Sequence, residues 1–259
     1  MNSEKNNIDM SNVINKLFEG DCLEYMKKIP AGSVDMILCD LPYGTTACKW
    51  DNVIPFDLLW GGYNRIIKDN GAIILFGSEP FSSKLRLSNL GMYKYDWIWD
   101  KISGVGFFDC KFRPLKTHEI ISVFSKGGCS NGSKLAVKYN PQGVIKIEKL
   151  IKNKKVTSEI FHSKTSKDYI SKGYNYPKSI IQFSKDKKTA HPTQKPVALL
   201  EYLIKTYTNE GELVLDNCMG SGSTGVACIN TNRNFIGMEL DDKYFSIAKE
   251  RIEKANSEV

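Results

Sequence analysis

The stretch VLDNCMGSGSTG at residues 214–225 decides the fold. It begins in an apolar segment that predicts a buried strand ending at Asp216, and it leads into a predicted helix over residues 224–230. Between them lies the pattern G-x-G-x-x-G, formed by Gly220, Gly222 and Gly225. Such a turn lets the backbone approach a ligand closely at the N-terminus of a helix, although it can also simply connect a strand to a helix.

The residues that follow strengthen the prediction of a nucleoside site. The next predicted strand, over residues 235–240, contains Glu239, whose carboxylate can accept both hydroxyls of a ribose. Only 20 residues follow Glu239, which is enough for one helix, so strands from earlier in the chain must complete the sheet. A dinucleotide-binding fold begins with this turn, and its late position here predicts a circularly permuted sheet. Asp216 would repel a pyrophosphate but can hold an ammonium group, which favours a cofactor with a ribose, an amino acid and no phosphate: S-adenosylmethionine.

Strands and helices alternate along the rest of the chain. Apolar runs predict strands over residues 34–40, 72–76, 96–99, 120–124 and 212–216. Helices are predicted over residues 55–69, 80–90, 196–208 and 242–255. This alternation predicts an α/β fold with a parallel sheet covered by helices on both faces.

The segment Asp40-Leu41-Pro42-Tyr43-Gly44 directly follows a predicted buried strand. Open α/β sheets bind ligands at the carboxyl ends of their strands. The Asp40 carboxylate and the Leu41 carbonyl are adjacent acceptors for the two N–H bonds of an exocyclic amine, Pro42 fixes the local backbone, and Tyr43 offers a ring on which a planar base can stack. An ordinary turn between a strand and a loop is the alternative interpretation of these residues.

The charge of the chain is unevenly distributed. The 259 residues carry a formal net charge of +7, yet residues 126–190 hold 15 lysines, no arginine and only four acidic residues. Six aromatic residues are interleaved with these lysines, namely Tyr139, Phe161, Tyr169, Tyr174, Tyr176 and Phe183. Lysines with aromatic rings suit a polyanion with stackable bases, whereas a solvated Lys-rich loop is the simpler alternative.

Composition excludes several other classes of protein. The hydrophobic fraction of 41% excludes a wholly disordered chain, and no apolar run approaches the roughly 20 residues of a membrane span. The first twelve residues are polar and are expected to form a loose arm. Seven cysteines without a CxxC pair indicate a reduced cytoplasmic protein with neither a zinc site nor a disulfide framework.

In combination these motifs resemble the beta class of S-adenosylmethionine-dependent DNA amino methyltransferases. The resemblance covers nearly the whole chain. The segments that carry it are residues 20–44, residues 113–124, the motif HPTQKP at 191–196, and the two segments that contain Gly220 and Glu239. The resemblance implies a Rossmann-like class I methyltransferase sheet, circularly permuted, with a catalytic half at 1–125, a basic target-recognition insert at 126–190 and a cofactor-binding half at 191–259. Leu41 departs from the family, in which a second proline is more frequent.

The resemblance also implies roles for individual residues. Asp40, Leu41 and Pro42 would form the catalytic segment that holds the target amine, and Tyr43 would stack on the extruded base. The predicted cofactor residues are Asp21 and Cys22 at the adenine, Glu239 at the ribose, Lys195 at the carboxylate, and Asp216, Gly220, Ser221, Gly222, Ser223 and Thr224 around the methionine part. Two simpler roles stay open, since Asp21 can cap a helix over residues 23–28 and Lys195 can be a solvated lysine. His118 and His191 are expected to be structural.

The predicted activity is methylation of adenine N6 in double-stranded DNA, without a metal. An Asp in the first position of the tetrapeptide favours adenine in this family, and cytosine N4 is the alternative. A 5-methylcytosine enzyme is disfavoured because the chain has no Pro-Cys pair. A catalytically idle DNA-binding subunit and an RNA substrate are further alternatives. By analogy with the family, a homodimer and a cognate restriction enzyme are candidate partners.

Overall fold

The computed structural model describes residues 10, 13–46, 48, 51–151, 169–186 and 194–258. They form two compact units: a main unit that runs to Asn140 and resumes at Ser179, and a second unit, Pro141–Lys178. The expected N-terminal arm, apart from Met10, lies outside the described residues, as do Phe161 and His191.

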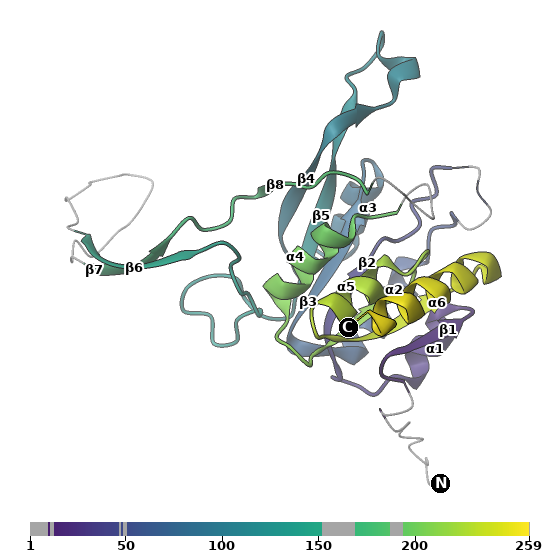
Figure 1. Cartoon of the computed structure of the whole chain (residues 1–259), viewed down its shortest axis with the longest axis horizontal. Coiled ribbons are helices and arrows are strands. Elements are labelled where there is room, and N and C mark those ends of the chain that lie inside the picture. The colour runs from purple at the N-terminus through teal and green to yellow at the C-terminus, as the bar shows by residue number, and fades with distance from the viewer. Residues whose placement is uncertain are drawn as a thin grey trace. The chain divides into compact units, whose positions relative to one another are not determined.

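An eight-stranded sheet in the order β1-β10-β9-β2-β3-β5-β4-β8 forms the centre of the main unit (Figure 1). Its strands are β1 (Lys16–Glu19), β2 (Val34–Cys39), β3 (Ile67–Gly77), β4 (Tyr93–Val105), β5 (Lys116–Phe124), β8 (Ile180–Gln182), β9 (Leu213–Asp216) and β10 (Asn234–Glu239). The last strands of the chain lie between the first two, which confirms the permuted order expected from the late glycine turn.

The sheet is not wholly parallel, which corrects the expectation of a parallel sheet. Strand β5 runs antiparallel to both β3 and β4, whereas the other neighbouring pairs are parallel. A hairpin joins β4 directly to β5, with the short 3-10 helix η2 (Phe107–Asp109) near its tip, and a hairpin necessarily pairs its strands antiparallel.

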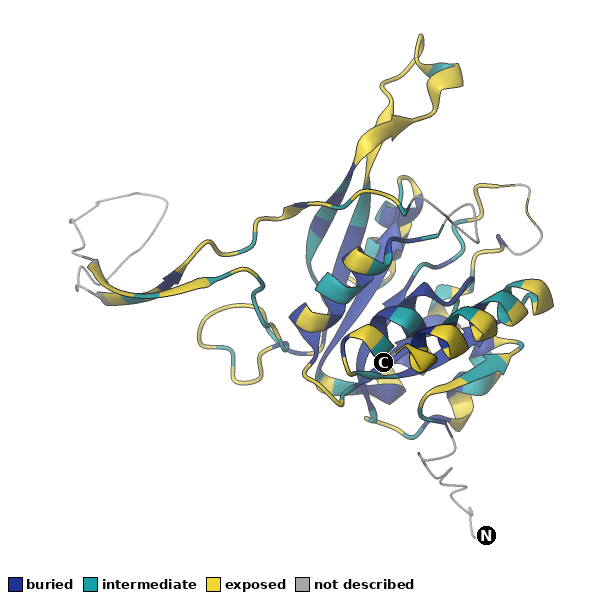
Figure 2. Cartoon of the chain, in the orientation of Figure 1, coloured by how far each residue is buried: buried dark blue, intermediate teal, exposed yellow. Residues whose placement is uncertain are grey.

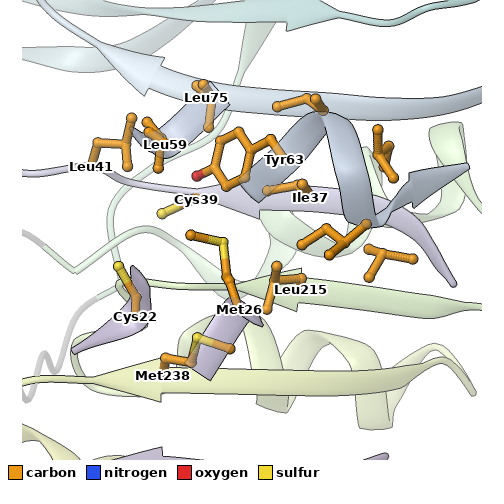
Figure 3. Close-up of a cluster of buried hydrophobic side chains, with 14 of the residues drawn as sticks. Cys22, Met26, Ile37, Cys39, Leu41, Leu59, Tyr63, Leu75, Leu215 and Met238 are labelled. Carbon is orange, nitrogen blue, oxygen red and sulfur yellow. The ribbon is translucent and has the colours of Figure 1, made fainter. Parts of the chain in front are cut away.

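Helices cover both faces of the sheet, as predicted. The helices are α1 (Cys22–Lys28), α2 (Phe56–Ile66), α3 (Phe81–Ser88), α4 (Val197–Tyr207), α5 (Ser223–Asn230) and α6 (Asp242–Ser257). One buried cluster joins α1, α2 and α3 to the sheet and includes Met26, Tyr63 and Leu215 (Figure 3). A second cluster joins α4, α5 and α6 to the other face, and the central strands between the two are buried (Figure 2).

The register between β2 and β9 brings the two ends of the chain together. Ile37 pairs with Leu215 in a parallel ladder at the middle of the sheet. Asp216 is the next residue of β9 and Asp40 directly follows β2, so both carboxylates lie at the carboxyl ends of neighbouring parallel strands. The spacing of a sheet puts their Cα atoms roughly 8 Å apart.

Local differences from the sequence-based predictions have clear causes. The helix predicted over residues 55–69 ends at Ile66, because the backbone at Ile67 enters β3 and pairs with Val34. Strand β1 was not predicted, since its four residues gain their hydrogen-bond partners only by pairing with β10 at the edge of the sheet.

The basic segment defined by charge does not coincide with one structural unit. The second unit spans residues 141–178, within the predicted insert at 126–190, and contains the antiparallel strands β6 (Ile145–Ile151) and β7 (Tyr169–Tyr174). Val137 and Phe183, from the two ends of the insert, pack with the second buried cluster of the main unit. Tyr174 and Tyr176 are exposed, and the role of the insert in target recognition stays a prediction.

Among the described residues, no helix is long and apolar enough to cross a membrane. Within the same ranges, no group of three or more His, Cys, Asp or Glu side chains is arranged to hold a metal ion. All seven cysteines are free thiols.

Candidate active site

A cavity of about 580 Å³ opens at the carboxyl ends of the central strands. The predicted site residues Asp21, Cys22, Asp40, Leu41, Pro42, Tyr43, Lys195, Asp216, Gly220, Ser221, Ser223, Thr224 and Glu239 all line it. Gly222 is the exception. Residues that are far apart in the sequence therefore share one cavity, with a volume typical of small-molecule sites.

The Asp40 carboxylate is held from both sides. Its Oδ1 accepts a hydrogen bond from the Tyr43 hydroxyl at 2.7 Å, and its Oδ2 lies 2.5 Å from Lys195 Nζ. Burial and the nearby charge of Asp40 raise the pKa of Tyr43, so the phenol keeps its proton and acts as the donor. Each carboxylate oxygen has a second lone pair, which leaves Asp40 able to accept hydrogen bonds from a ligand.

Lys195 also belongs to a buried charge network that the sequence did not reveal. Its Nζ lies 3.3 Å from Glu119 Oε2, and Lys101 Nζ lies 3.2 Å from Glu119 Oε1. Burial raises the pKa of Glu119, but the two lysines outweigh burial and lower it overall. The role predicted for Lys195, pairing with the carboxylate of a cofactor, stays a prediction, because in the structure its partners are Asp40 and Glu119.

Asp216 lies at the end of β9 and lines the cavity. Burial raises its pKa to about 7, against an ordinary value of 3.8. Thr224 Oγ1 donates to Asp216 Oδ2 at 2.6 Å, and the Cys218 backbone N–H donates to Oδ1 at 3.2 Å. Its hydrogen-bond donors, which also include the Cys39 thiol, are neutral groups, and a buried carboxylate held by neutral donors is suited to a cationic group of a ligand.

Glu239 ends β10 on the far side of the glycine turn. Its two oxygens accept the backbone N–H groups of Gly220 and Asp241, at 2.8 and 2.9 Å. Burial raises the pKa of Glu239, and these N–H donors oppose that effect. Asp21 is the N-cap of α1, accepting the Leu23 N–H at 2.8 Å, so the capping role is present, and Asp21 lines the cavity as well.

The glycine turn is shaped by close packing. Gly222 has a φ of +77°, and a Cβ built there would lie 2.9 Å from the Cβ of Ala248 on α6. Gly222 thus allows the turn to approach α6, and it does so outside the cavity. Arg251 of α6 donates to the Ser221 carbonyl at 2.5 Å and to the Ser223 hydroxyl at 3.2 Å. These two hydrogen bonds attach the turn to α6.

Asn217 is a further cavity residue, and no sequence motif indicates its role. The buried Tyr63 hydroxyl donates to Asn217 Oδ1 at 2.6 Å, and Asn217 Nδ2 lies 3.5 Å from the sulfurs of Cys22 and Cys218. Tyr63 comes from a helix on one face of the sheet, and no spacing in the sequence relates it to residue 217. Only the fold makes this contact.

Comparison with known proteins shows the family to which the chain belongs. The family model described as DNA methylase, N6_N4_Mtase, matches residues 34–250. The chain belongs to this DNA methylase family. The match spans both the segment around Asp40 and the glycine turn, so both halves of the cavity fall within it.

Individual relatives agree with the family match. The DNA adenine methyltransferase YhdJ of Escherichia coli is 27% identical over 93% of this chain and 83% of its own length. The crystal structure of an M1.HpyAVI–SAM complex is 26% identical, with a TM-score of 0.59, over 91% of this chain and 98% of that one. The cytosine-N4-specific PvuII DNA methyltransferase has a TM-score of 0.66 at 16% identity over 93% of this chain and 90% of that one, and shows the shared fold alone.

The prediction of an S-adenosylmethionine-dependent DNA amino methyltransferase is thereby confirmed at the level of the family. The residues of this DNA methylase also fit the cofactor chemically. The cavity offers a buried carboxylate for an ammonium group at Asp216, a second carboxylate at the end of the next strand for a ribose at Glu239, and a glycine turn between them. The predicted contacts of the individual residues with the cofactor stay predictions.

Proposed function

We propose that this methyltransferase acts on the N6 amine of adenine in double-stranded DNA. The observation that carries the proposal is that the Asp40-Leu41-Pro42-Tyr43 segment lines the same cavity as Asp216 and Glu239. An Asp in the first position of this segment favours adenine over cytosine, and the similarity to an adenine methyltransferase supports that choice.

The target amine is a poor nucleophile, because its lone pair is conjugated with the ring. In the proposed mechanism Asp40 and the Leu41 carbonyl accept its two N–H bonds, which localises the lone pair on nitrogen. The same acceptors stabilise the positive charge that develops on nitrogen during attack. The Asp40 carboxylate then accepts the proton that the methylated nitrogen loses. Lys195 acts as a positioning residue, since it fixes the Asp40 carboxylate at 2.5 Å.

The base must leave the helical stack to reach this segment, at a cost of about a few kcal/mol. Tyr43 is proposed to recover part of that cost by stacking on the base. Its ring already stacks on Phe81, with ring centroids 4.8 Å apart and planes 28° apart. Phe81 is buried, so it gives Tyr43 a rigid support.

S-adenosylmethionine, when bound, supplies a methyl group on a positively charged sulfur. Asp216 is proposed to hold its ammonium group, Glu239 its ribose, and Asp21 with Cys22 the edge of its adenine. Gly220, Ser221, Ser223 and Thr224, which line the cavity, would surround the methionine part. Asp216 and Asp40 lie at the carboxyl ends of β9 and β2, which are neighbouring parallel strands, so a methyl donor held at Asp216 and an amine held at Asp40 would lie close together.

Two measurements test the proposal. Methylated plasmid DNA is digested to nucleosides and analysed by mass spectrometry, and N6-methyl-2′-deoxyadenosine is expected. Methyl groups found only on N4 of cytosine would overturn the choice of adenine. In a competition assay between duplex DNA and structured RNA, methylation of the RNA alone would overturn DNA as the substrate.

Asp40→Ala tests the catalytic segment. We expect turnover to be abolished and cofactor affinity, measured by calorimetry, to stay within about threefold. Asp69→Ala, which alters an exposed acid away from the cavity, is the matched control. Full activity of Asp40→Ala would refute the mechanism, and a wild-type protein without binding heat for the cofactor would indicate an idle subunit.

The basic insert at 126–190 is proposed to contact the DNA backbone through its lysines. Each neutralised phosphate releases counterions, so the logarithm of DNA affinity is expected to fall with the logarithm of salt concentration by about 0.9 per contact. An affinity independent of salt would contradict this role. A homodimer and a cognate restriction enzyme stay candidate partners of the methyltransferase.

A further inference from the structure

The tip of the β4–β5 hairpin, residues 102–115, carries an unusual amount of exposed apolar surface. The side chains of Phe107, Phe108 and Phe112 are 77%, 100% and 89% exposed. The tip extends beyond the buried part of the sheet, where the colour changes from dark blue to yellow (Figure 2). Soluble proteins rarely expose such clusters of large apolar side chains unless the surface binds something.

The hairpin tip continues directly from the wall of the cavity. Trp99, Lys101 and Val105 of β4 and Glu119 of β5 all line the cavity. Phe107 and Phe108 follow Val105 by two and three residues, within roughly 10 Å along the chain. If a ligand is too large for the cavity and inserts only one part of itself there, the rest of that ligand would contact the tip.

The backbone of the hairpin is bent where it leaves the sheet. The β4–β5 register shifts between Asp100 and Val105, and Ile102 has a φ of +68°. The Asp100 carboxylate accepts the Ile102 N–H at 2.8 Å, which holds this bulge in place. Bulges of this kind twist a strand pair and redirect the residues beyond it.

The charge around the tip matches a polyanion. The tip and the adjoining Lys116 hold three exposed basic residues, Lys111, Arg113 and Lys116, and one acid, Asp109, which forms an ion pair with Arg113. Lys111 and Lys116 are exposed between and beside the phenylalanines. Exposed rings flanked by basic side chains suit a partner with both phosphates and stackable faces.

We propose that the hairpin tip inserts into duplex DNA next to the target base, with its phenylalanine rings stacking on the bases that the extruded nucleotide leaves behind. This inference rests on the proposed function and adds to it the element that compensates for the lost stacking. Phenylalanine has no hydrogen-bonding group, so the tip would support base extrusion without reading sequence. Apolar wedges between base steps act in this way in other DNA-bending proteins.

The experiment compares Phe108→Ala and the triple change Phe107→Ala, Phe108→Ala and Phe112→Ala with the wild type. The substrate is a duplex oligonucleotide carrying the site that sequencing of methylated DNA identifies, in a fully paired form and with a mismatch opposite the target base. A mismatch lowers the cost of extrusion. On the paired duplex we expect kcat/KM to fall about tenfold for Phe108→Ala and further for the triple variant, and on the mismatched duplex the deficit should shrink to about twofold.

Matched variants separate stacking from folding. Phe108→Trp keeps an aromatic ring and should retain activity within about twofold. Leu87→Ala removes another exposed apolar side chain, on α3 (68% exposed), and should behave as wild type. Cofactor affinity should be the same in all variants, which shows that the cavity is intact.

Three results would overturn the inference. One is a triple variant with wild-type kcat/KM on the paired duplex, and another is an equal loss on paired and mismatched duplexes. The third concerns the oligomeric state in sedimentation: the wild type is a dimer, and the triple variant is a monomer with unchanged kcat/KM. The tip would then bind a second copy of the chain. A wild type that leaves no N6-methyladenine in the sequenced DNA would refute the proposed function itself, and this outcome is distinguishable from the other three.

Discussion

Asp216→Asn tests the electrostatics of the cofactor cavity through the stability of the free protein. Burial raises the pKa of Asp216 to about 7 in the folded chain, whereas the unfolded chain has the ordinary value of 3.8. Between these values the folded protein binds more protons than the unfolded protein, so stability falls as the pH rises. Three pKa units correspond to about 4 kcal/mol of unfolding free energy, lost by pH 7 and constant above it.

The asparagine variant removes this titration and keeps the shape of the side chain. Its amide replaces one acceptor, and the Thr224 hydroxyl can rotate to accept from it, at a cost of about 1 kcal/mol. We therefore expect the variant to be slightly less stable than wild type at pH 4 and about 3 kcal/mol more stable at pH 8. Urea unfolding of both proteins at steps between pH 4 and pH 8, without cofactor, measures the difference.

The affinity for the cofactor should depend on pH in the opposite direction to stability: it should rise with pH in the wild type. If the ionised Asp216 holds an ammonium group, wild-type affinity for S-adenosylmethionine should rise as the pH passes through about 7, and the variant should bind about tenfold to a hundredfold more weakly at pH 8. A stability difference that is constant from pH 4 to pH 8 would refute the argument from burial. An unchanged cofactor affinity would refute the role of Asp216 in binding.

Two further predictions concern the glycine turn and the buried lysine. Gly222→Ala should lower the unfolding free energy by about 2–4 kcal/mol, because it combines a left-handed backbone with a clash against Ala248. Gly211→Ala has the same φ of +77° but open space around the new Cβ, so urea unfolding should show a loss of only about 1 kcal/mol, and equal losses would contradict the clash. Lys195→Met should lower kcat at least tenfold and leave the cofactor Kd within about threefold, since in the structure Lys195 fixes Asp40. A tenfold weaker cofactor Kd with unchanged kcat would instead support the pairing of Lys195 with the cofactor carboxylate.

The sequence was most informative where function requires a particular residue type at a particular spacing. The glycine turn, the carboxylate at Glu239 and the segment at Asp40 could be identified because each follows an apolar run that predicts a buried strand. The late position of the turn also predicted the permuted order of the sheet. These features are local, or depend only on the order of local features, and sequence carries both directly.

Tertiary structure decided what depends on contacts between distant segments. The edge strand β1, the antiparallel β5 and the early end of α2 all depend on pairing with strands elsewhere in the chain. The network of Lys195, Glu119 and Lys101 and the hydrogen bond from Tyr63 to Asn217 likewise join residues without any fixed spacing. Exposure is the clearest case, because only the fold shows that Phe107, Phe108 and Phe112 have no core to pack against.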